Sequence, residues 1–233
     1  MSRTFTGMAH VYSSRAELSV RTATVWDVGI TVGFDLDMTL IDPRPGMVAA
    51  MNALGEKSGL PFDGEAFASN LGPPLDQALR EFGAPEDRIP ELIWQFRELY
   101  PELVVPSTVA LPGAAEALRA VRAAGGRTLV VTGKYAPNAQ LHLDALGLRV
   151  DALVGELWST QKAAALLEHE ARAYVGDHLG DVRGARAANA MSVAVATGPC
   201  TREELAEEGA DVVFDSLVDF PEWFARTFVE TVV

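Results

Sequence analysis

Two aspartates follow an apolar segment near the start of the chain, in the order Asp35-Leu-Asp37-Met-Thr39. If residues 29–34 form a buried strand of a parallel sheet, both carboxylates lie at its carboxyl end, where such sheets bind ligands. Two carboxylates this close repel each other unless they share a proton or a cation. A strand-ending turn held by an aspartate side chain also fits this pattern, so the segment alone marks only a candidate site.

A second acidic segment, Gly176-Asp177-His-Leu-Gly-Asp181, follows another predicted strand at residues 173–175. Capping of the next helix explains one of its aspartates but not both. Because parallel strands end at the same edge of a sheet, the two acidic segments are expected to lie together. Oxygen ligands of this kind suit a hard divalent cation, and Mg²⁺ keeps waters that a phosphate group can replace. The predicted ligands are Asp35, Asp37, Asp177 and Asp181.

Phosphate oxygens have candidate partners at two further places. Thr132, Gly133 and Lys134 end a third predicted strand and offer a hydroxyl, free backbone N–H groups and an ammonium. Lys162 begins a predicted helix, although an isolated lysine is far more often a solvated surface residue.

Short β-branched runs alternate with alanine-rich helical segments over most of the chain. Strands are predicted at residues 29–34, 127–132, 152–154, 173–175, 191–195 and 211–214, and helices at 114–124, 136–146, 161–169 and 180–189. This alternation favours right-handed crossovers and an α/β fold with a parallel sheet. We expect a catalytic core of residues 25–42 and 107–233, preceded by an extension at residues 1–24 that lacks the features of a secretory signal.

Residues 43–106 lack convincing strands and are predicted to form an inserted, all-helical cap. Helical segments at residues 47–57, 75–82 and 88–100 are separated by breaks rich in glycine and proline. We expect Pro74 and Leu75, in the break that follows Gly72, to face the substrate. Trp94, Phe96 and Tyr100 recur at spacings that favour the core of this cap.

Composition limits the classes of function. The 233 residues carry a formal net charge of -13, which argues against a general nucleic-acid binder. No segment has the apolar length of a membrane span, and Cys200 is the single cysteine, so no intrachain disulfide can form. We therefore expect a cytoplasmic protein that binds neither nucleic acid nor a membrane, and we expect it to be monomeric or homodimeric.

The motifs described above, taken in their order along the chain, resemble those of the haloacid dehalogenase superfamily. The resemblance is closest to its phosphoglycolate-phosphatase-like members with a helical cap. The resemblance covers residues 29–215 and implies a Rossmann-like three-layer core. Its four signatures are the Asp35-Leu-Asp37-Met-Thr39 segment, Thr132, Lys162, and Gly176-Asp177 with Asp181.

The resemblance implies a phosphate-monoester hydrolase that works through an aspartyl-phosphate on Asp35. It implies that Asp37 protonates the leaving oxygen and later activates water, while its backbone carbonyl contacts Mg²⁺. Asp35 and Asp177 then bind the metal through their carboxylates, and Asp181 supports them. Thr132 and Lys162 stabilise the phosphoryl oxygens, and Thr39, Gly133 and Lys134 are further candidate phosphate contacts.

Two departures from the family pattern keep other readings open. Met38 stands where the family usually has glycine, and the stretch from Lys162 to Asp177 is short. Lys134 is the alternative phosphate-stabilising lysine, and His178 is a further candidate substrate contact. A phosphomutase, or a binding or regulatory member with little turnover, stays possible. A dehalogenase is disfavoured, since that reaction needs no proton donor at Asp37.

Overall fold

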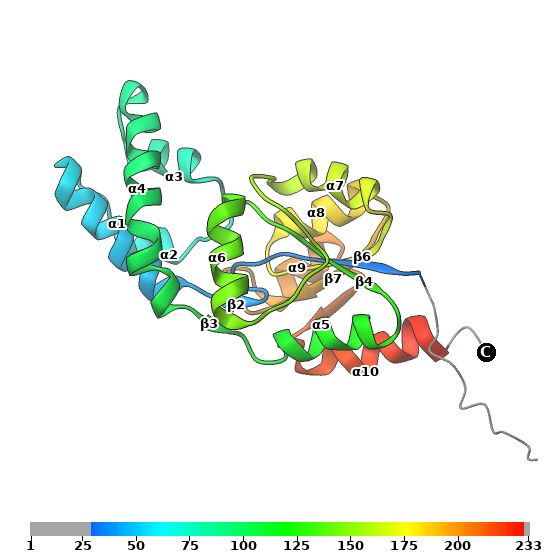
Figure 1. The fold of residues 1–233 in the computed structure, drawn as a ribbon. Coiled ribbons are helices and arrows are strands. Elements are labelled where there is room, and N and C mark those ends of the chain that lie inside the picture. Colours follow the sequence, from blue (N-terminus) through cyan, green and yellow to red (C-terminus); the bar gives the residue numbers. More distant parts are fainter. Residues whose placement is uncertain (1–28, 231–233) are drawn as a thin grey trace, which may run out of the picture.

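The computed structural model describes residues 29–230. In this part of the chain six parallel strands form one sheet in the order β5–β4–β1–β6–β7–β8. Three of them, β4, β6 and β7, are labelled in Figure 1. The strands are β1 (Thr31–Phe34), β4 (Arg127–Val131), β5 (Ala152–Val154), β6 (Ala171–Gly176), β7 (Met191–Val195) and β8 (Val212–Phe214). Each overlaps a strand predicted from the sequence. Strand β1 lies in the middle, where successive connections diverge toward opposite edges, and this position favours a ligand site at its carboxyl end.

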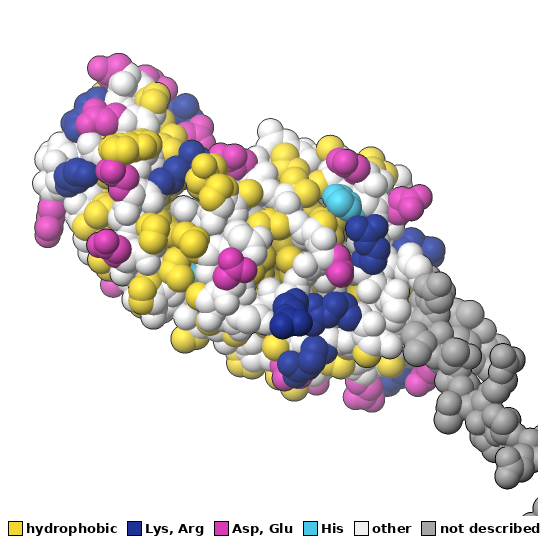
Figure 2. All heavy atoms as spheres, viewed as in Figure 1, with side chains coloured by type: hydrophobic (Ala, Val, Ile, Leu, Met, Phe, Trp, Pro, Cys, Tyr) yellow, Lys and Arg dark blue, Asp and Glu magenta, His cyan; other side chains and the backbone are white. Residues whose placement is uncertain are grey.

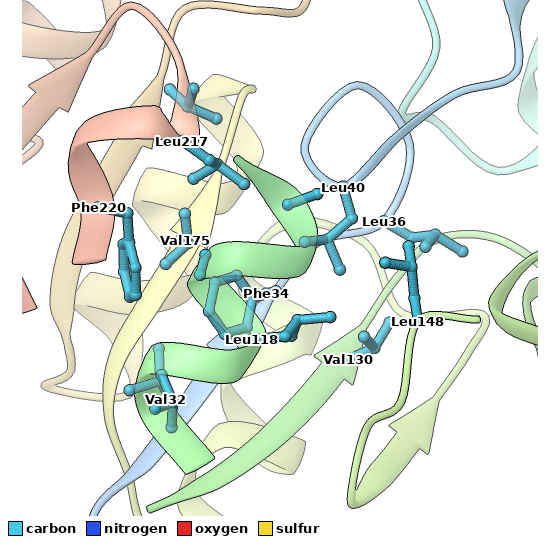
Figure 3. Packing of buried hydrophobic residues seen from close by; sticks show 14 of the residues in the cluster. Val32, Phe34, Leu36, Leu40, Leu118, Val130, Leu148, Val175, Leu217 and Phe220 are labelled. Atoms are coloured by element: carbon cyan, nitrogen blue, oxygen red, sulfur yellow. The ribbon is translucent and has the colours of Figure 1, made fainter. Parts of the chain in front are cut away.

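Helices cover both faces of the sheet, because successive side chains of a strand point to opposite sides. On one face Phe34 and Val130 pack with Leu118 and Phe220 (Figure 3). On the other face Leu129 and its neighbours pack against α7 and α8. The helices of the core are α5 (Ala114–Ala123), α6 (Ala136–Leu146), α7 (Lys162–Glu168), α8 (Leu179–Ala187), α9 (Arg202–Glu208) and α10 (Phe220–Phe224). The predicted three-layer α/β core is therefore confirmed.

A helical cap is inserted between β2 (Ile41–Asp42) and β3 (Val109–Ala110), which pair with each other as an antiparallel ribbon. Its helices are α1 (Arg44–Ser58), α2 (Gly64–Ala68), α3 (Leu75–Glu81) and α4 (Ile89–Leu103), and they stand beside the sheet in Figure 1. They share an apolar core of their own, which includes Met51, Leu79, Leu92 and Phe96. The cap can thus hold its shape while the two short strands connect it to the sheet.

The structure corrects one expectation about the cap. Phe96 and Tyr100 are buried, as predicted, but Trp94 is 61% exposed. The reason is helical geometry: residues two apart point to different sides of a helix, whereas residues four apart share one. The predicted extension at residues 1–24 lies outside the described residues. The division into residues 25–42, 43–106 and 107–233 stays a prediction.

Candidate active site

The turn after β1 presents both aspartates of the first motif. Asp35 extends the strand, and its N–H donates to the carbonyl of Val175 over 2.8 Å. Met38 then takes a left-handed conformation with φ of 58°, although it is not glycine. This conformation costs a residue with a side chain about 1–2 kcal/mol. The turn is held by the Met38 N–H, which donates to the Ile41 carbonyl over 2.8 Å, and by the Thr197 hydroxyl, which donates to the Met38 carbonyl.

Three buried carboxylates converge beyond the carboxyl ends of β1 and β6. One oxygen from each of Asp35, Asp177 and Asp181 lies within 4.8 Å of the others. Thr39 is fully buried, and its hydroxyl donates to Asp177 over 2.7 Å. Two glycines give these acids room, because a Cβ on Gly176 or Gly198 would collide with Asp181 or Asp177 respectively.

Lys162 bridges this cluster from the start of α7. Its ammonium lies 2.9 Å from Asp35 and 2.7 Å from Asp181, and its side chain is 1% exposed. The same ammonium donates to the hydroxyl of Tyr174 over 2.9 Å, and that hydroxyl donates to the Val131 carbonyl over 2.6 Å. Burial alone would lower the pKa of Lys162, but the two carboxylates outweigh it and raise the pKa. Lys162 is therefore a fixed positive charge beside Asp35, and it is not the solvated surface residue that an isolated lysine most often is.

The acid cluster carries more negative charge than one lysine can neutralise. Burial raises the pKa of Asp35 to about 7; Lys162 opposes that rise, and Asp181 adds to it. Burial also raises the pKa of Asp177 well above its ordinary value, and the negative charges of Asp181 and Asp35 contribute to this rise. A divalent cation would relieve this repulsion, and three carboxylates form the oxygen donor set that such an ion prefers. The residues present thus fit a bound divalent metal.

A second ion pair lies nearer the cap. The ammonium of Lys134, just beyond β4, lies 3.0 Å from Oδ2 of Asp37. It also donates to the hydroxyl of Tyr100 in α4, and that hydroxyl lies 2.8 Å from Nε2 of His142. Since an ammonium can only donate, the Tyr100 hydroxyl keeps its own proton to donate to His142.

The protonation states along this chain of contacts agree with those roles. Burial, followed by the charge of Lys134, lowers the pKa of His142 to about 3, so the ring is neutral and accepts a hydrogen bond. Burial alone would lower the pKa of Lys134, but Asp37 and Tyr100 reverse the effect and raise it. Burial raises the pKa of Tyr100 to about 12, so its hydroxyl stays protonated.

A cavity of about 630 Å³ separates the cap from this edge of the sheet. Asp37, Gly133 and Lys134 line its inner end, and Pro74 and Leu75 line it from the cap. On the face shown in Figure 2, hydrophobic side chains extend across the region where the cap meets the core. The cavity places the Asp37 side chain where a bound ligand can reach it.

The cap touches the core through the loop before α3. A Cβ on Gly72 would collide with the indole of Trp158, and one on Gly133 would collide with the Gly72 carbonyl oxygen. The Trp158 and His178 rings lie 4.9 Å apart between centroids. The Nδ1 atom of His178 accepts from the Gly180 N–H over 3.0 Å and caps α8. This contact gives His178 a structural role at the helix start.

The structure brings most of the predicted site residues together. Thr132 is buried next to Gly133, and its hydroxyl accepts from the Lys134 N–H over 3.2 Å. Thr39 differs from the expectation: its buried hydroxyl is directed at Asp177, which suits a residue that orients this acid rather than one that contacts phosphate.

Sequence reasoning missed four contributors to this region: Tyr100, Tyr174, Thr197 and Gly198. For Tyr100 the only signal was its helical spacing. The other three lie in or after strands, and nothing in their local sequence indicates which motif they contact.

Comparison with known proteins agrees with this geometry. The family model of haloacid dehalogenase-like hydrolases matches residues 32–195. The chain belongs to the haloacid dehalogenase-like hydrolases. This hydrolase is 32% identical to a phosphoglycolate phosphatase of Caulobacter vibrioides, over 83% of this chain and 90% of that protein. It is 30% identical to a phosphoglycolate phosphatase of Chromobacterium violaceum, over 81% and 93% respectively.

A solved structure shows the same fold. A haloacid dehalogenase-like family hydrolase from Streptococcus pneumoniae is 20% identical to this hydrolase and superimposes with a TM-score of 0.73. The match covers 84% of this chain and 99% of that one. Together the comparisons confirm the predicted phosphoglycolate-phosphatase-like subgroup and an enzyme of the phosphatase type. Within residues 29–230, no helix has the length and apolar character needed to cross a membrane.

Proposed function

We propose that this hydrolase cleaves a small phosphate monoester with the help of Mg²⁺, through an aspartyl-phosphate on Asp35. The observation that carries the proposal is the cluster in which Lys162 lies 2.9 Å from Asp35 and 2.7 Å from Asp181, next to Asp177. A nucleophilic carboxylate, a fixed cation and a set of metal-binding oxygens are the parts that phosphoryl transfer requires.

The reaction runs in two displacements. First, a carboxylate oxygen of Asp35 attacks phosphorus, the bond from phosphorus to the ester oxygen breaks, and Asp37 gives a proton to the leaving alkoxide. Then water attacks the same phosphorus while Asp37 takes one of its protons. The bond between phosphorus and Asp35 breaks, so that inorganic phosphate leaves and both aspartates return to their starting states.

Asp37 has a different environment from Asp35, which suits a different role. Its side chain is drawn toward Lys134, 3.0 Å away, and the three-carboxylate metal group is formed by other aspartates. The contact with Lys134 would hold Asp37 in position when it takes a proton from water. An arriving phosphate group would compete for the Lys134 ammonium and so release the Asp37 side chain toward the leaving oxygen.

The remaining parts stabilise charge. Lys162 and the hydroxyl of Thr132 would contact phosphoryl oxygens, which is mostly electrostatic stabilisation. Asp35, Asp177 and Asp181 would hold Mg²⁺, with the Asp37 backbone carbonyl as a further ligand. When bound, the ion would neutralise these acids and polarise the phosphoryl oxygens.

A direct test measures hydrolysis of 4-nitrophenyl phosphate with Mg²⁺ and with excess chelator. Turnover should require the metal and should disappear in Asp35→Asn, because the nucleophile is gone. Full activity in excess chelator contradicts the metal role. Binding of phosphate esters without any turnover would instead favour the binding or regulatory alternative.

The phosphomutase alternative has a separate test, because a mutase returns phosphate to a sugar only when a bisphosphate primes it. If no phosphate is transferred between sugar phosphates when the bisphosphate is present, while inorganic phosphate is released, the phosphomutase alternative is excluded. A cytoplasmic location and a monomeric or homodimeric state remain predictions from the sequence.

A further inference from the structure

The cap wall of the cavity is rich in apolar residues. It is built by cap residues Phe67, Leu71, Leu75, Ile89, Ile93 and Phe96. In a phosphatase the phosphate would lie next to Asp35, so the leaving group must extend from there toward the cap. This wall therefore meets the part of the ester that leaves as the alcohol.

The charges that line the cavity cancel one another. Among residues 29–230, its lining includes three cations, Lys134, Arg80 and Arg97, and three acids, Asp37, Asp76 and Glu156. Each cation is paired with one of these acids: Lys134 with Asp37 at 3.0 Å, Arg80 with Asp76 at 2.5 Å, and Arg97 with Glu156 at 2.8 Å.

All three cations have further partners, and that of Lys134 is the Tyr100 hydroxyl. Arg80 also lies 2.9 Å from Glu86. The Arg97 guanidinium lies 3.6 Å from the centroid of the Tyr135 ring. A second anionic group on the substrate would lie beside these acids, and each cation of the lining that it could meet already has an acidic partner.

The size of the cavity points the same way. Pockets of roughly 300–1,000 Å³ enclose ligands of drug-like size, and this cavity measures about 630 Å³. A two-carbon acid would leave much of the apolar wall in contact with water. A ring-sized apolar group would cover it, at about 25 cal/mol for each Å² removed from water.

We infer that the preferred substrate is a phosphate monoester of an uncharged, largely apolar alcohol, larger than a two-carbon acid. This inference rests on the proposed phosphatase function and adds the class of leaving group to it. It sets this hydrolase apart from relatives named for phosphoglycolate, whose leaving group bears a carboxylate.

Three esters test the leaving group: benzyl phosphate, 2-phosphoglycolate, and carbamoylmethyl phosphate, the neutral amide counterpart of phosphoglycolate. The kcat/KM should fall in the order benzyl, carbamoylmethyl, phosphoglycolate, with at least about tenfold between the first and the last. Equal or faster turnover of phosphoglycolate overturns the inference but leaves the phosphatase function intact. Absence of Asp35-dependent turnover with all three esters, and with 4-nitrophenyl phosphate, overturns both.

A substitution provides a second test, which concerns the charge pairs of the cavity lining. Glu156→Gln frees Arg97, so the kcat/KM for phosphoglycolate should rise by at least about threefold, while that for benzyl phosphate changes less. The matched control is Glu98→Gln, which removes an acid from the helix that carries Arg97. Glu98 lies 3.6 Å from Lys57, and neither residue lines the cavity. No gain for phosphoglycolate in Glu156→Gln, or an equal gain in the control, contradicts the role of charge pairing.

Discussion

Lys134 lies 3.0 Å from Asp37 and at the same time donates a hydrogen bond to Tyr100. Asp37 and Lys134 belong to the core, whereas Tyr100 lies in α4 of the cap. One ammonium group thus joins the proposed acid and base to a cap side chain. The position of the cap can therefore influence how strongly Lys134 holds Asp37.

Asp37→Asn should separate the two displacements of the proposed reaction. The variant keeps the nucleophile Asp35 but loses the group that protonates the leaving oxygen and activates water. General acid–base groups contribute about 10²–10⁴-fold, so steady turnover should fall by that order. With 4-nitrophenyl phosphate, whose leaving group needs little protonation, a phosphoenzyme should build up.

Mass spectrometry after rapid quench should find that phosphate on the peptide containing Asp35. The double variant with Asp35→Asn is the control and should carry none. Wild-type turnover by Asp37→Asn, or phosphate on another residue, would show that these roles are assigned wrongly.

Tyr100→Phe should change the leaving-group dependence of the rate. Without the hydroxyl, the Lys134 ammonium keeps Asp37 as its partner and holds it more firmly, so that the Asp37 side chain reaches the leaving oxygen less often. We expect kcat for benzyl phosphate to fall about tenfold, below the full contribution of a general acid. The kcat for 4-nitrophenyl phosphate should change much less, because its departure depends little on a proton.

A purely structural defect would lower both rates equally and would contradict this coupling. Thermal unfolding of the same variant should show a loss of about 1–3 kcal/mol, because His142 loses its buried donor.

The acid cluster predicts how the stability of the metal-free protein depends on pH. The pKa of Asp35 is about 7 in the folded state, against an ordinary value of 3.8. The folded state therefore binds more protons than the unfolded state between these values, and stability falls as pH rises from about 4 to 7. The loss should be on the order of a few kcal/mol.

Chemical denaturation in excess chelator, across this pH range, measures the effect, and added Mg²⁺ should reverse it. Asp177→Asn should weaken Mg²⁺ binding and flatten the pH profile in chelator, since one of the repelling acids is gone. Stability that rises with pH in chelator would contradict this account of the cluster.

Met38 allows a test of backbone strain against side-chain burial. Its side chain is buried, so Met38→Ala loses apolar contacts worth about 2–5 kcal/mol and keeps the strained conformation. Met38→Gly loses the same contacts but gains about 1–2 kcal/mol from relief at a φ of 58°. Both variants should be less stable than the parent, and the glycine variant should be the more stable of the two. If the glycine variant is instead the less stable of the two in urea denaturation, the backbone at residue 38 is not strained as described.

The sequence predicted the parts of the fold that have a strong local pattern. The buried strands, and helices such as α6 (Ala136–Leu146), stand out by periodicity and by glycines at their ends. Helix α2 and the two-residue strands β2 and β3 were missed, because such short elements carry too little pattern. Helix α10 was missed because it has five residues, and α9 because Leu205 is its one buried residue, which leaves no apolar periodicity.

The residues of the candidate site also divide into those that a motif in the sequence predicts and those that it does not. Asp35, Asp37, Asp177 and Lys162 could be located because family motifs follow in order along the chain. The partners of these residues could not be located. Tyr174 reaches Lys162, and Thr197 reaches Met38, only because separate strands end side by side. Such contacts depend on how the sheet is assembled, which no short segment of sequence specifies.

The contact between Gly72 and the indole of Trp158 gives the protein an optical property. Trp158 belongs to the core and lies against a cap loop, so any separation of cap and core would open one face of the ring to water. Its fluorescence emission would then shift to longer wavelengths. Replacing Trp26, Trp94 and Trp223 with phenylalanine would leave Trp158 as the single tryptophan of the sequence. Stopped-flow emission from that variant would follow cap movement during turnover without an attached dye.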